Sequence, residues 1–164
     1  SGGTFLLPAI ARELMRQQMQ NEEERKVRDQ NCIFCKIANG EIPSAEVYED
    51  ELFRVILDMG PASRGHALIL PKEHFKDVCE LEEPYASRVL ALGGKIGDAM
   101  KKGLGCTGFN LVQNNGKSAG QTVFHFHMHV IPRYDDNAPI VSWTPGSASP
   151  EELQETAAQI KSCL

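Results

Sequence analysis

Three histidines at alternate positions, His125, His127 and His129, are the residues of this chain best suited to carry out chemistry. On a helix this spacing would scatter the rings. On a strand it places all three on one face, with Phe126 and Met128 on the other. The neighbouring residues favour a strand, so we expect a ladder of imidazoles. Two chemistries suit such a ladder: metal ligation, and nucleophilic or acid–base catalysis.

The polar loop 114–122 precedes these histidines and contains two glycines, Gly116 and Gly120. Such a loop can turn several backbone N–H groups towards one anion. It also supplies a side-chain amide from Asn114 and a hydroxyl from Thr122. An anion pocket leading into a histidine strand favours phosphoryl or nucleotidyl transfer over metal ligation.

Length and charge limit the other possibilities. A chain of 164 residues with net charge −5 predicts one main domain and no long nucleic-acid partner, because wrapping nucleic acid needs a basic face. No apolar run approaches the ~20 residues of a membrane span, so we expect no membrane partner. Five cysteines, of which only Cys32 and Cys35 are close together, do not form a secreted disulfide framework, which predicts a reducing, cytoplasmic location.

The elements expected to position the histidines belong to an α+β fold. Apolar alternation and turn residues predict about five strands, at 47–49, 52–58, 67–70, 109–113 and 126–132. A helical apolar face predicts a helix over 84–102 ended by Gly103, and Ser149 with Glu152 predicts a capped C-terminal helix. Because strands and helices do not alternate regularly, we expect a mainly antiparallel sheet with two or three helices.

Residues 1–30 differ in composition from the rest of the chain. Residues 9–30 are charged, contain no glycine and show only a partial apolar stripe, which predicts an extra N-terminal helix, or else a frayed tail. Ser1, Gly2 and Gly3 are typical of a tag remnant. We therefore expect an extension over 1–30 and the main domain over 31–164.

Taken together, these motifs resemble the histidine triad (HIT) family, in particular its bacterial Hit and Hint-like nucleotide hydrolases. The signature His-x-His-x-His followed by apolar residues reads here as His125-Phe-His-Met-His-Val-Ile131. The resemblance spans residues 31–143, and further matching segments fall in the family's order at 32–37, 40–43, 48–50, 65–66, 69–74 and 115–122.

The resemblance implies a role for each catalytic residue. His127 would attack an α-phosphate and form a nucleotidyl-histidine that water then cleaves. A backbone carbonyl would hold its other nitrogen, with His66 and His125 buttressing the ring. His129 would bind phosphate oxygens or assist the leaving group. Imidazole suits this role, because at an unperturbed pKa of about 6.5 much of it is neutral near pH 7.

The resemblance also implies a nucleotide site. Asp58 would accept the ribose hydroxyls, although a turn cap before Gly60 is an alternative for this residue. The phosphate would meet Asn114, Gly120, Gln121 and Thr122, together with His127 and His129. An apolar slot for the base would be lined by Phe34, Ile37, Phe53, Leu57 and Met59, with ordinary core as the alternative for Phe53 and Leu57.

Cys32 and Cys35 form a Cys-x-x-Cys pair, which alone is ambiguous between zinc and redox chemistry. The chain resembles a branch of the family that binds structural zinc through this pair with His74 and His125. The alternative is two reduced thiols packed as small apolar groups.

Within the family, Asn114 resembles the adenosine phosphoramidase branch, so a purine nucleoside phosphoramidase is the first expectation. Dinucleoside polyphosphate hydrolysis is the second, because Ile131-Pro-Arg133 departs from the Gly-Gly-Arg stretch of the phosphoramidases. A non-enzymatic nucleotide-binding regulator and a hydrolase with zinc held by the triad itself remain alternatives. The resemblance further implies a homodimer, formed through the 84–102 helix and the strand from Phe109.

Overall fold

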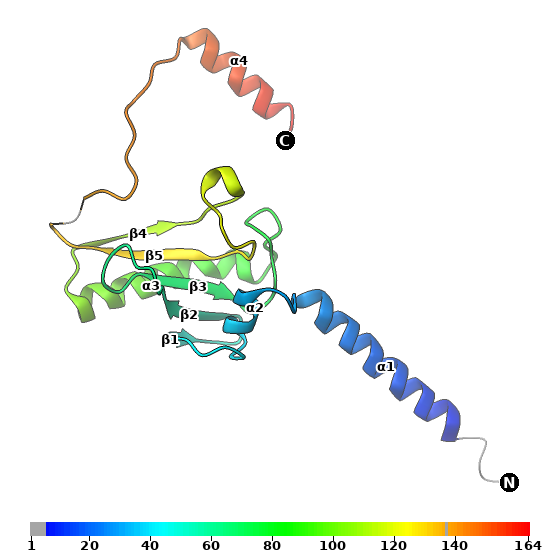
Figure 1. The fold of residues 1–164 in the computed structure, drawn as a ribbon. Helices are drawn as coiled ribbons and strands as arrows, with labels where there is room; N and C mark the ends of the chain where they lie inside the picture. Colours follow the sequence, from blue (N-terminus) through cyan, green and yellow to red (C-terminus); the bar gives the residue numbers. More distant parts are fainter. Residues whose placement is uncertain (1–5, 137) are drawn as a thin grey trace.

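The computed structural model describes residues 6–136 and 138–164, so the predicted tag remnant at residues 1–3 lies outside the described residues. Its centre is a five-stranded antiparallel sheet in the order β1-β2-β3-β5-β4 (Figure 1). The strands are β1 (Glu46–Glu49), β2 (Phe53–Leu57), β3 (Ala67–Pro71), β4 (Gly108–Val112) and β5 (Met128–Arg133). The predicted α+β fold is confirmed.

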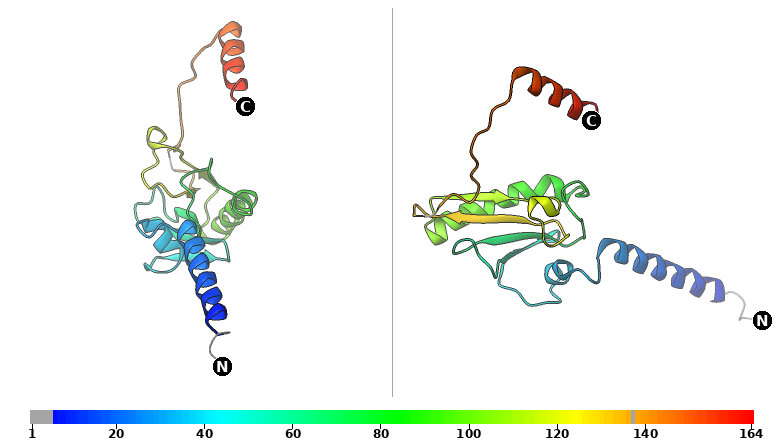
Figure 2. Two further views of the ribbon diagram at one scale, coloured as in Figure 1. Left: turned by 90° about the vertical axis from the view of Figure 1, so that its right-hand side faces the viewer. Right: turned by 45° about the horizontal axis from the view of Figure 1, so that its top comes forward.

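One face of the sheet is covered by helix α3 (Tyr85–Leu104), as Figure 2 shows. Its apolar residues recur every three or four positions and are buried against the sheet. Gly97 allows a close approach to β4, because an added Cβ would lie 2.4 Å from the Phe109 ring. The helix ends at Gly105 in the left-handed conformation, with φ of 73°. The helix therefore extends about half a turn beyond its predicted end at Gly103.

The opposite face carries the short helix α2 (Ile33–Ala38), which packs on a second apolar cluster of Ile56, Leu68 and Leu70. Cys32 caps the helix, with its Sγ accepting the N–H of Cys35 at 3.4 Å. This helix is not predicted from the sequence, because six residues are too few to show helical periodicity.

Two further helices stand away from the sheet in Figures 1 and 2. Helix α1 (Leu6–Val27) agrees with the predicted N-terminal helix, and α4 (Pro150–Lys161) begins with the predicted capping box at Ser149 and Glu152. Neither helix packs against a strand or helix of the described chain. Whether residues 1–30 form a separate unit stays a prediction. No described helix is both long and apolar enough to cross a membrane.

Candidate active site and metal centre

The three triad histidines lie at the start of β5 on the α2 side of the sheet. Only His129 belongs to the strand, because β5 begins at Met128 and the two earlier histidines lie in its lead-in. The predicted alternation nevertheless holds, since Phe126 and Met128 are buried in the core beneath α3. His125 is fully buried and His127 is 7% exposed.

The ring of His127 is oriented by its own backbone segment. Its Nδ1–H donates to the carbonyl oxygen of His125 at 2.7 Å, so in the neutral ring the lone pair lies on Nε2. Phe34 packs edge-on against the ring, with centroids 5.0 Å apart. Burial lowers the pKa of His127, partly offset by the bond to His125. Burial therefore favours the neutral ring, with the lone pair on Nε2.

His66 meets His129 rather than His127. Its Nε2 lies 2.9 Å from His129 Nδ1 and 3.6 Å from Asp58 Oδ2. The predicted buttressing of the His127 ring by His66 is therefore wrong: Ala67 pairs with Val130 across the sheet, which brings the preceding His66 to the far end of the triad. Asp58 also caps the turn, with Oδ1 accepting the Gly60 N–H at 2.8 Å.

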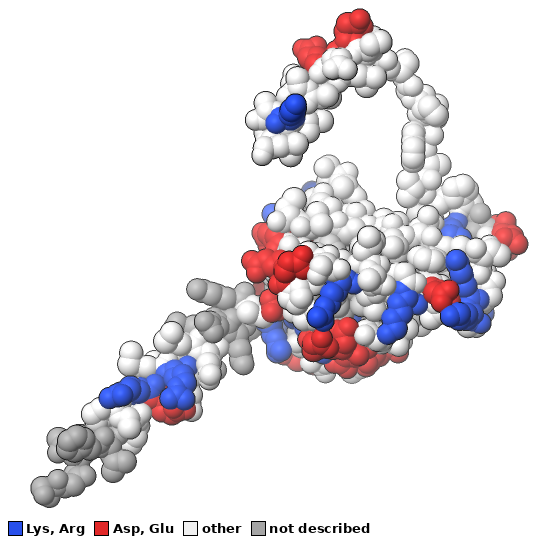
Figure 3. All heavy atoms as spheres, turned by 180° about the vertical axis from the view of Figure 1, so that it is seen from behind, with Lys and Arg blue, Asp and Glu red and all other residues white. Residues whose placement is uncertain are grey.

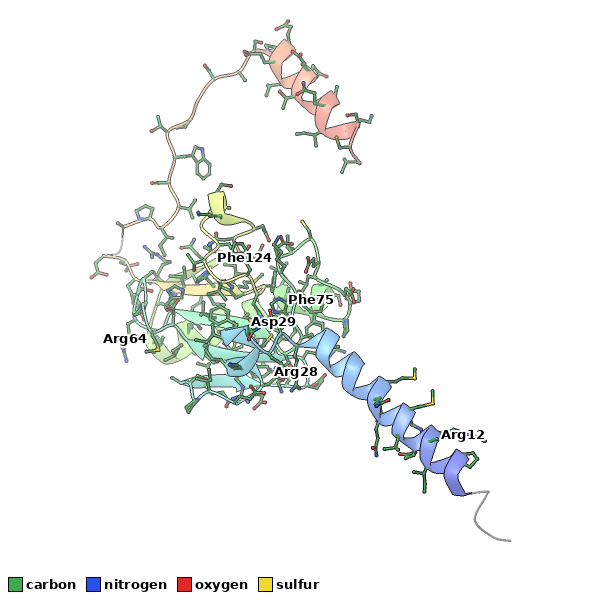
Figure 4. All side chains as sticks on the ribbon, turned by 45° about the vertical axis from the view of Figure 1, so that its right-hand side comes forward. Arg12, Arg28, Asp29, Arg64, Phe75 and Phe124 are labelled. Carbon is green, nitrogen blue, oxygen red and sulfur yellow. The ribbon has the colours of Figure 1, made fainter. Side chains whose placement is uncertain are left out.

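At the other end of the triad, the structure gathers the four predicted metal-binding side chains. His125 Nδ1 lies 3.5 Å from Cys32 Sγ, 3.4 Å from Cys35 Sγ and 3.3 Å from His74 Nδ1. Cys35 Sγ is 3.3 Å from His74 Nδ1. This cluster lies where α1 joins the sheet domain, beside the labelled Asp29 in Figure 4, whose carbonyl accepts the Cys32 N–H at 3.0 Å.

The cluster has the size and chemistry of a tetrahedral zinc site. Zinc bonds of ~2.3 Å to sulfur and ~2.0–2.1 Å to nitrogen imply ligand separations of roughly 3.3–3.6 Å between nitrogen–nitrogen and sulfur–nitrogen pairs, which the four distances match. His125 Nε2 lies 3.0 Å from the Pro71 carbonyl and must carry the proton. Its Nδ1 lone pair therefore faces two thiols and an imidazole, as a ligand nitrogen would. Burial raises the pKa of metal-free Cys35 to about 12.

The alternative in which all three triad histidines bind one zinc does not fit these bonds. His127 Nδ1 is committed to the His125 carbonyl, while His125 Nδ1 points to the cysteines. Among the described residues, the two groupings of side chains that could hold a metal each contain only one triad histidine.

The loop 114–122 forms a compact turn around the short 3-10 helix η1 (Lys117–Ala119). Gly120 has φ of 88°, and a Cβ added there would lie 3.9 Å from Asn114 Nδ2, so this amide lies beside the glycine backbone. Gln121 is 2% exposed; it accepts the Gly116 N–H and donates to Lys76 and Val123 carbonyls. Its side-chain amide thus holds the loop to itself and to the Lys76 carbonyl, and its nucleotide contact stays a prediction. The phosphate contact of Thr122 stays a prediction.

The predicted apolar slot for a base is only partly formed by its predicted residues. Phe34 and Ile37 pack on the α2-side cluster. Phe53 belongs to the core under α3, on the opposite face, so its predicted role in the slot is wrong. Leu57 is 39% exposed and Met59 fully exposed, and their contact with a base stays a prediction.

Sequence reasoning missed the backbone groups that orient the rings. The Pro71 carbonyl and the Ala62 amide N–H bond to His125 and His66, respectively. No side-chain type reveals such partners. The only signal is indirect: Pro71 lies within the family-like segment 69–74, and Ala62 lies shortly before the segment 65–66.

The histidines therefore lie together at one end of an open antiparallel sheet, with the His127 ring oriented by the His125 carbonyl. Comparison with known proteins specifies the family. The HIT domain model matches residues 39–136, and the chain belongs to this family.

Close relatives cover most of the chain. The "Protein hit" of Bacillus subtilis is 41% identical over 134 residues, which is 80% of this chain and 92% of that protein. A protein of Schizosaccharomyces pombe named adenosine 5′-monophosphoramidase is 38% identical, covering 80% and 97%. An Arabidopsis thaliana protein named adenylylsulfatase is 40% identical, covering 86% and 71%.

Among solved structures, a zinc-bound histidine triad family protein from Mycobacterium smegmatis superimposes with a TM-score of 0.63 at 37% identity. The match covers 82% of this chain and 98% of that one. The similarity therefore extends over nearly the whole length of that zinc-bound structure.

Proposed function

We propose that this protein hydrolyses purine nucleoside phosphoramidates at the α-phosphate through a nucleotidyl-histidine on His127. The observation that carries the proposal is the 2.7 Å bond from His127 Nδ1–H to the His125 carbonyl. This bond leaves Nε2 as the nucleophilic nitrogen, and Nε2 makes no hydrogen bond within the described part of the chain.

The reaction proceeds in two displacements. The Nε2 lone pair forms a bond to phosphorus while the phosphorus–nitrogen bond of the substrate breaks, and its electron pair departs with the leaving amine. Water then attacks the same phosphorus and releases the nucleoside monophosphate and His127. Water supplies the oxygen and the protons that the products gain, so the residues return to their starting state.

The nucleotide would occupy the α2 side of the sheet. Asp58 would accept the ribose hydroxyls through Oδ2, because its Oδ1 already caps the turn. Phe34 and Ile37 would contact the base. Asn114 and the Gly120 backbone would bind phosphoryl oxygens, where charge grows in the transition state.

The names of the relatives support cleavage at the α-phosphate, but they differ in the group that leaves. The S. pombe relative is named for an amide leaving group and the Arabidopsis relative for sulfate. Asn114 favours the amide. Dinucleoside polyphosphates are the alternative substrate, because the segment after His129 departs from the phosphoramidase pattern.

We further propose that Cys32, Cys35, His74 and His125 hold a structural zinc. Bound zinc would join α2 to the segment before β5 and fix the His125 carbonyl that orients His127. The five cysteines are all free among the described residues, which supports a reducing location such as the cytoplasm. We also propose a homodimer, because β4 is an edge strand with α3 beside it.

The test is brief incubation with adenosine 5′-phosphoramidate, quenching without acid, and intact mass measurement. The wild type should gain one adenylyl group, and His127→Ala should gain none and lose turnover by a factor of about 10³ or more while still binding the monophosphate. Diadenosine tetraphosphate and adenylyl sulfate serve as competing substrates. Near-wild-type turnover in His127→Ala would overturn the proposal.

A further inference from the structure

The loop between β2 and β3 contains a backbone donor aimed at His66. The N–H of Ala62 donates to His66 Nδ1 at 3.0 Å. An amide N–H can only donate, so Nδ1 must hold a lone pair. His66 is buried, and this burial lowers its pKa despite the neighbouring Asp58. The neutral His66 ring therefore carries its single proton on Nε2.

This assignment determines the state of the next ring. His66 Nε2 lies 2.9 Å from His129 Nδ1, so His66 donates and His129 Nδ1 accepts. A neutral imidazole has one N–H, and His129 must therefore carry it on Nε2. The Ala62 amide thus donates to His66, and His66 donates to His129. When both rings are neutral, this chain of hydrogen bonds allows only one tautomer for each ring.

The hydrogen bond from the Ala62 N–H to His66 also disfavours a metal ion at this end of the triad. Ligand atoms of Asp58, His66 and His129 lie within 4.8 Å of one another. A metal bound at His66 Nε2 would place the ring proton on Nδ1, directly against the Ala62 N–H. Two donors would then face each other in a buried position, which costs free energy.

The loop that presents the Ala62 amide is tied to the end of β5. Ser63 Oγ donates to the Pro132 carbonyl at 2.6 Å, and the Tyr134 hydroxyl donates to the Arg64 carbonyl at 2.8 Å. Gly65, at φ of 95°, sits where a Cβ would lie 2.3 Å from Leu104. Figure 4 places Arg64 at the end of the domain away from α1. The two hydrogen bonds hold the loop against the end of β5, the strand that carries His129.

We propose that the Ala62 amide and Ser63 are positioning groups that fix the tautomer of His129, which thereby meets the α-phosphate as a neutral Nε2–H hydrogen-bond donor. The inference rests on the proposed function for the identity of the phosphate. It assigns His129 to the phosphoryl oxygens and not to protonation of the leaving group. Full transfer of the Nε2 proton would leave an imidazolate, because Nδ1 holds only the hydrogen bond from His66.

The surroundings of His129 support a neutral ring. Burial lowers its pKa to about 4, with His127 and His66 lowering it further and Asp58 acting in the opposite sense. The leaving amine must then take its proton from water, the second substrate of the reaction. An uncharged donor still stabilises the charge that grows on the phosphoryl oxygens.

The first test reads the tautomer directly, in the absence of nucleotide. Long-range 1H–15N spectra of the full chain with labelled histidines should show His129 protonated on Nε2 and unprotonated on Nδ1 at pH 7.5. His66→Gln keeps a donor towards His129 and should keep this pattern. His66→Leu removes the donor and should give a mixture of tautomers. A wild-type His129 protonated on Nδ1, or on both nitrogens, overturns the proposal.

The second test uses turnover of adenosine 5′-phosphoramidate. His66→Leu should lower kcat about tenfold or more with little change in KM, and His66→Gln should recover most of it. Ser63→Ala should lower kcat a few-fold, with Ser63→Thr restoring it. The matched control is Ser87→Ala, because Ser87 likewise donates to a proline carbonyl, that of Pro84, on the exposed start of α3.

The two proposals fail in different ways. Absence of turnover with the expected wild-type tautomer overturns the proposed function and leaves the tautomer assignment intact. Turnover through His127 that is equally fast in His66→Leu and the wild type overturns the positioning role. Should His66→Leu fail to fold, the wild-type spectrum and the Ser63→Ala kinetics still decide.

Discussion

Each imidazole of the triad has one ring nitrogen committed to a neighbour, and that commitment decides what the other nitrogen can do. His125 gives Nε2–H to the Pro71 carbonyl and turns its lone pair to the cysteines. His127 gives Nδ1–H to the His125 carbonyl and keeps a free lone pair. His129 receives a bond on Nδ1 and keeps an N–H on Nε2. In the proposed function, these three identical side chains would act as metal ligand, nucleophile and hydrogen-bond donor.

The burial of His129 predicts a pH dependence of folding stability. Its pKa is about 4 in the folded chain and about 6.5 when unfolded, so between these values the unfolded chain binds more protons. The stability contributed by the neutral ring is fully present above about pH 6.5 and is lost as pH falls towards 4. Urea denaturation at pH 7.5, 6, 5 and 4.5 measures this loss.

The control for this prediction is His129→Gln, which cannot titrate. Its free energy of unfolding should fall less steeply between pH 6.5 and 4.5 than that of the wild type. The remaining slope reports His125 and His127, whose pKa values are also lowered by burial. Equal slopes in the two proteins would show that His129 is not buried as a neutral ring.

At the scale of elements, α2 connects the metal cluster to the nucleophile. The helix begins between Cys32 and Cys35, and Phe34 from its first turn packs against the His127 ring. The same short segment would therefore supply two ligands of the proposed zinc and one wall of the proposed active site. Loss of the metal would act on His127 through both Phe34 and the His125 carbonyl.

The proposed zinc site predicts that Cys32→Ser loses both metal and stability. Protein purified without added zinc should contain about one zinc per chain by elemental analysis, and Cys32→Ser should contain little. Its melting temperature should fall by about 5 °C or more, because metal binding contributes folding free energy. The matched control is Cys106→Ser, since Cys106 is a buried cysteine in the main core, away from the cluster. Metal-free wild type with full stability would contradict the site.

The sequence was sufficient to predict the strands, α3 and the capped α4, because apolar periodicity and turn residues act locally. It was insufficient for α2, whose six residues show no period. The triad was found from its spacing, yet the partner of His66 was not, because a contact between His66 and His129 depends on the register of β3 against β5. The structural bonds of Gln121 were not predicted, because a polar side chain in an anion loop can equally hold the loop itself.

For the whole molecule, the surface charge and the exposed sheet edges indicate which surfaces can bind other molecules. Figure 3 shows acidic and basic side chains mixed over this face of the sheet domain. Ion pairs of the described residues include Arg88–Glu51 and Lys102–Asp98. The face seen in Figure 3 therefore carries no continuous basic patch among the described residues. The sheet has two edges, β1 and β4, and an exposed edge strand is a template for pairing with another chain.

The proposed homodimer predicts association through the β4 edge and α3, with the β1 edge left free. Leu90 on α3 is 64% exposed, and a Cβ at Gly94, one turn on, would meet nothing within 4 Å. Gly94→Arg should therefore leave the protomer fold intact but block a two-fold contact across α3. Light scattering should give about twice 18.1 kDa for the wild type and the single-chain mass for the variant.

The matched control is Val47→Arg on β1. Val47 is 48% exposed at the opposite edge of the sheet, and this variant should remain dimeric. A wild-type monomer with full activity would rule out the dimer, and dissociation by Val47→Arg alone would move the interface to β1.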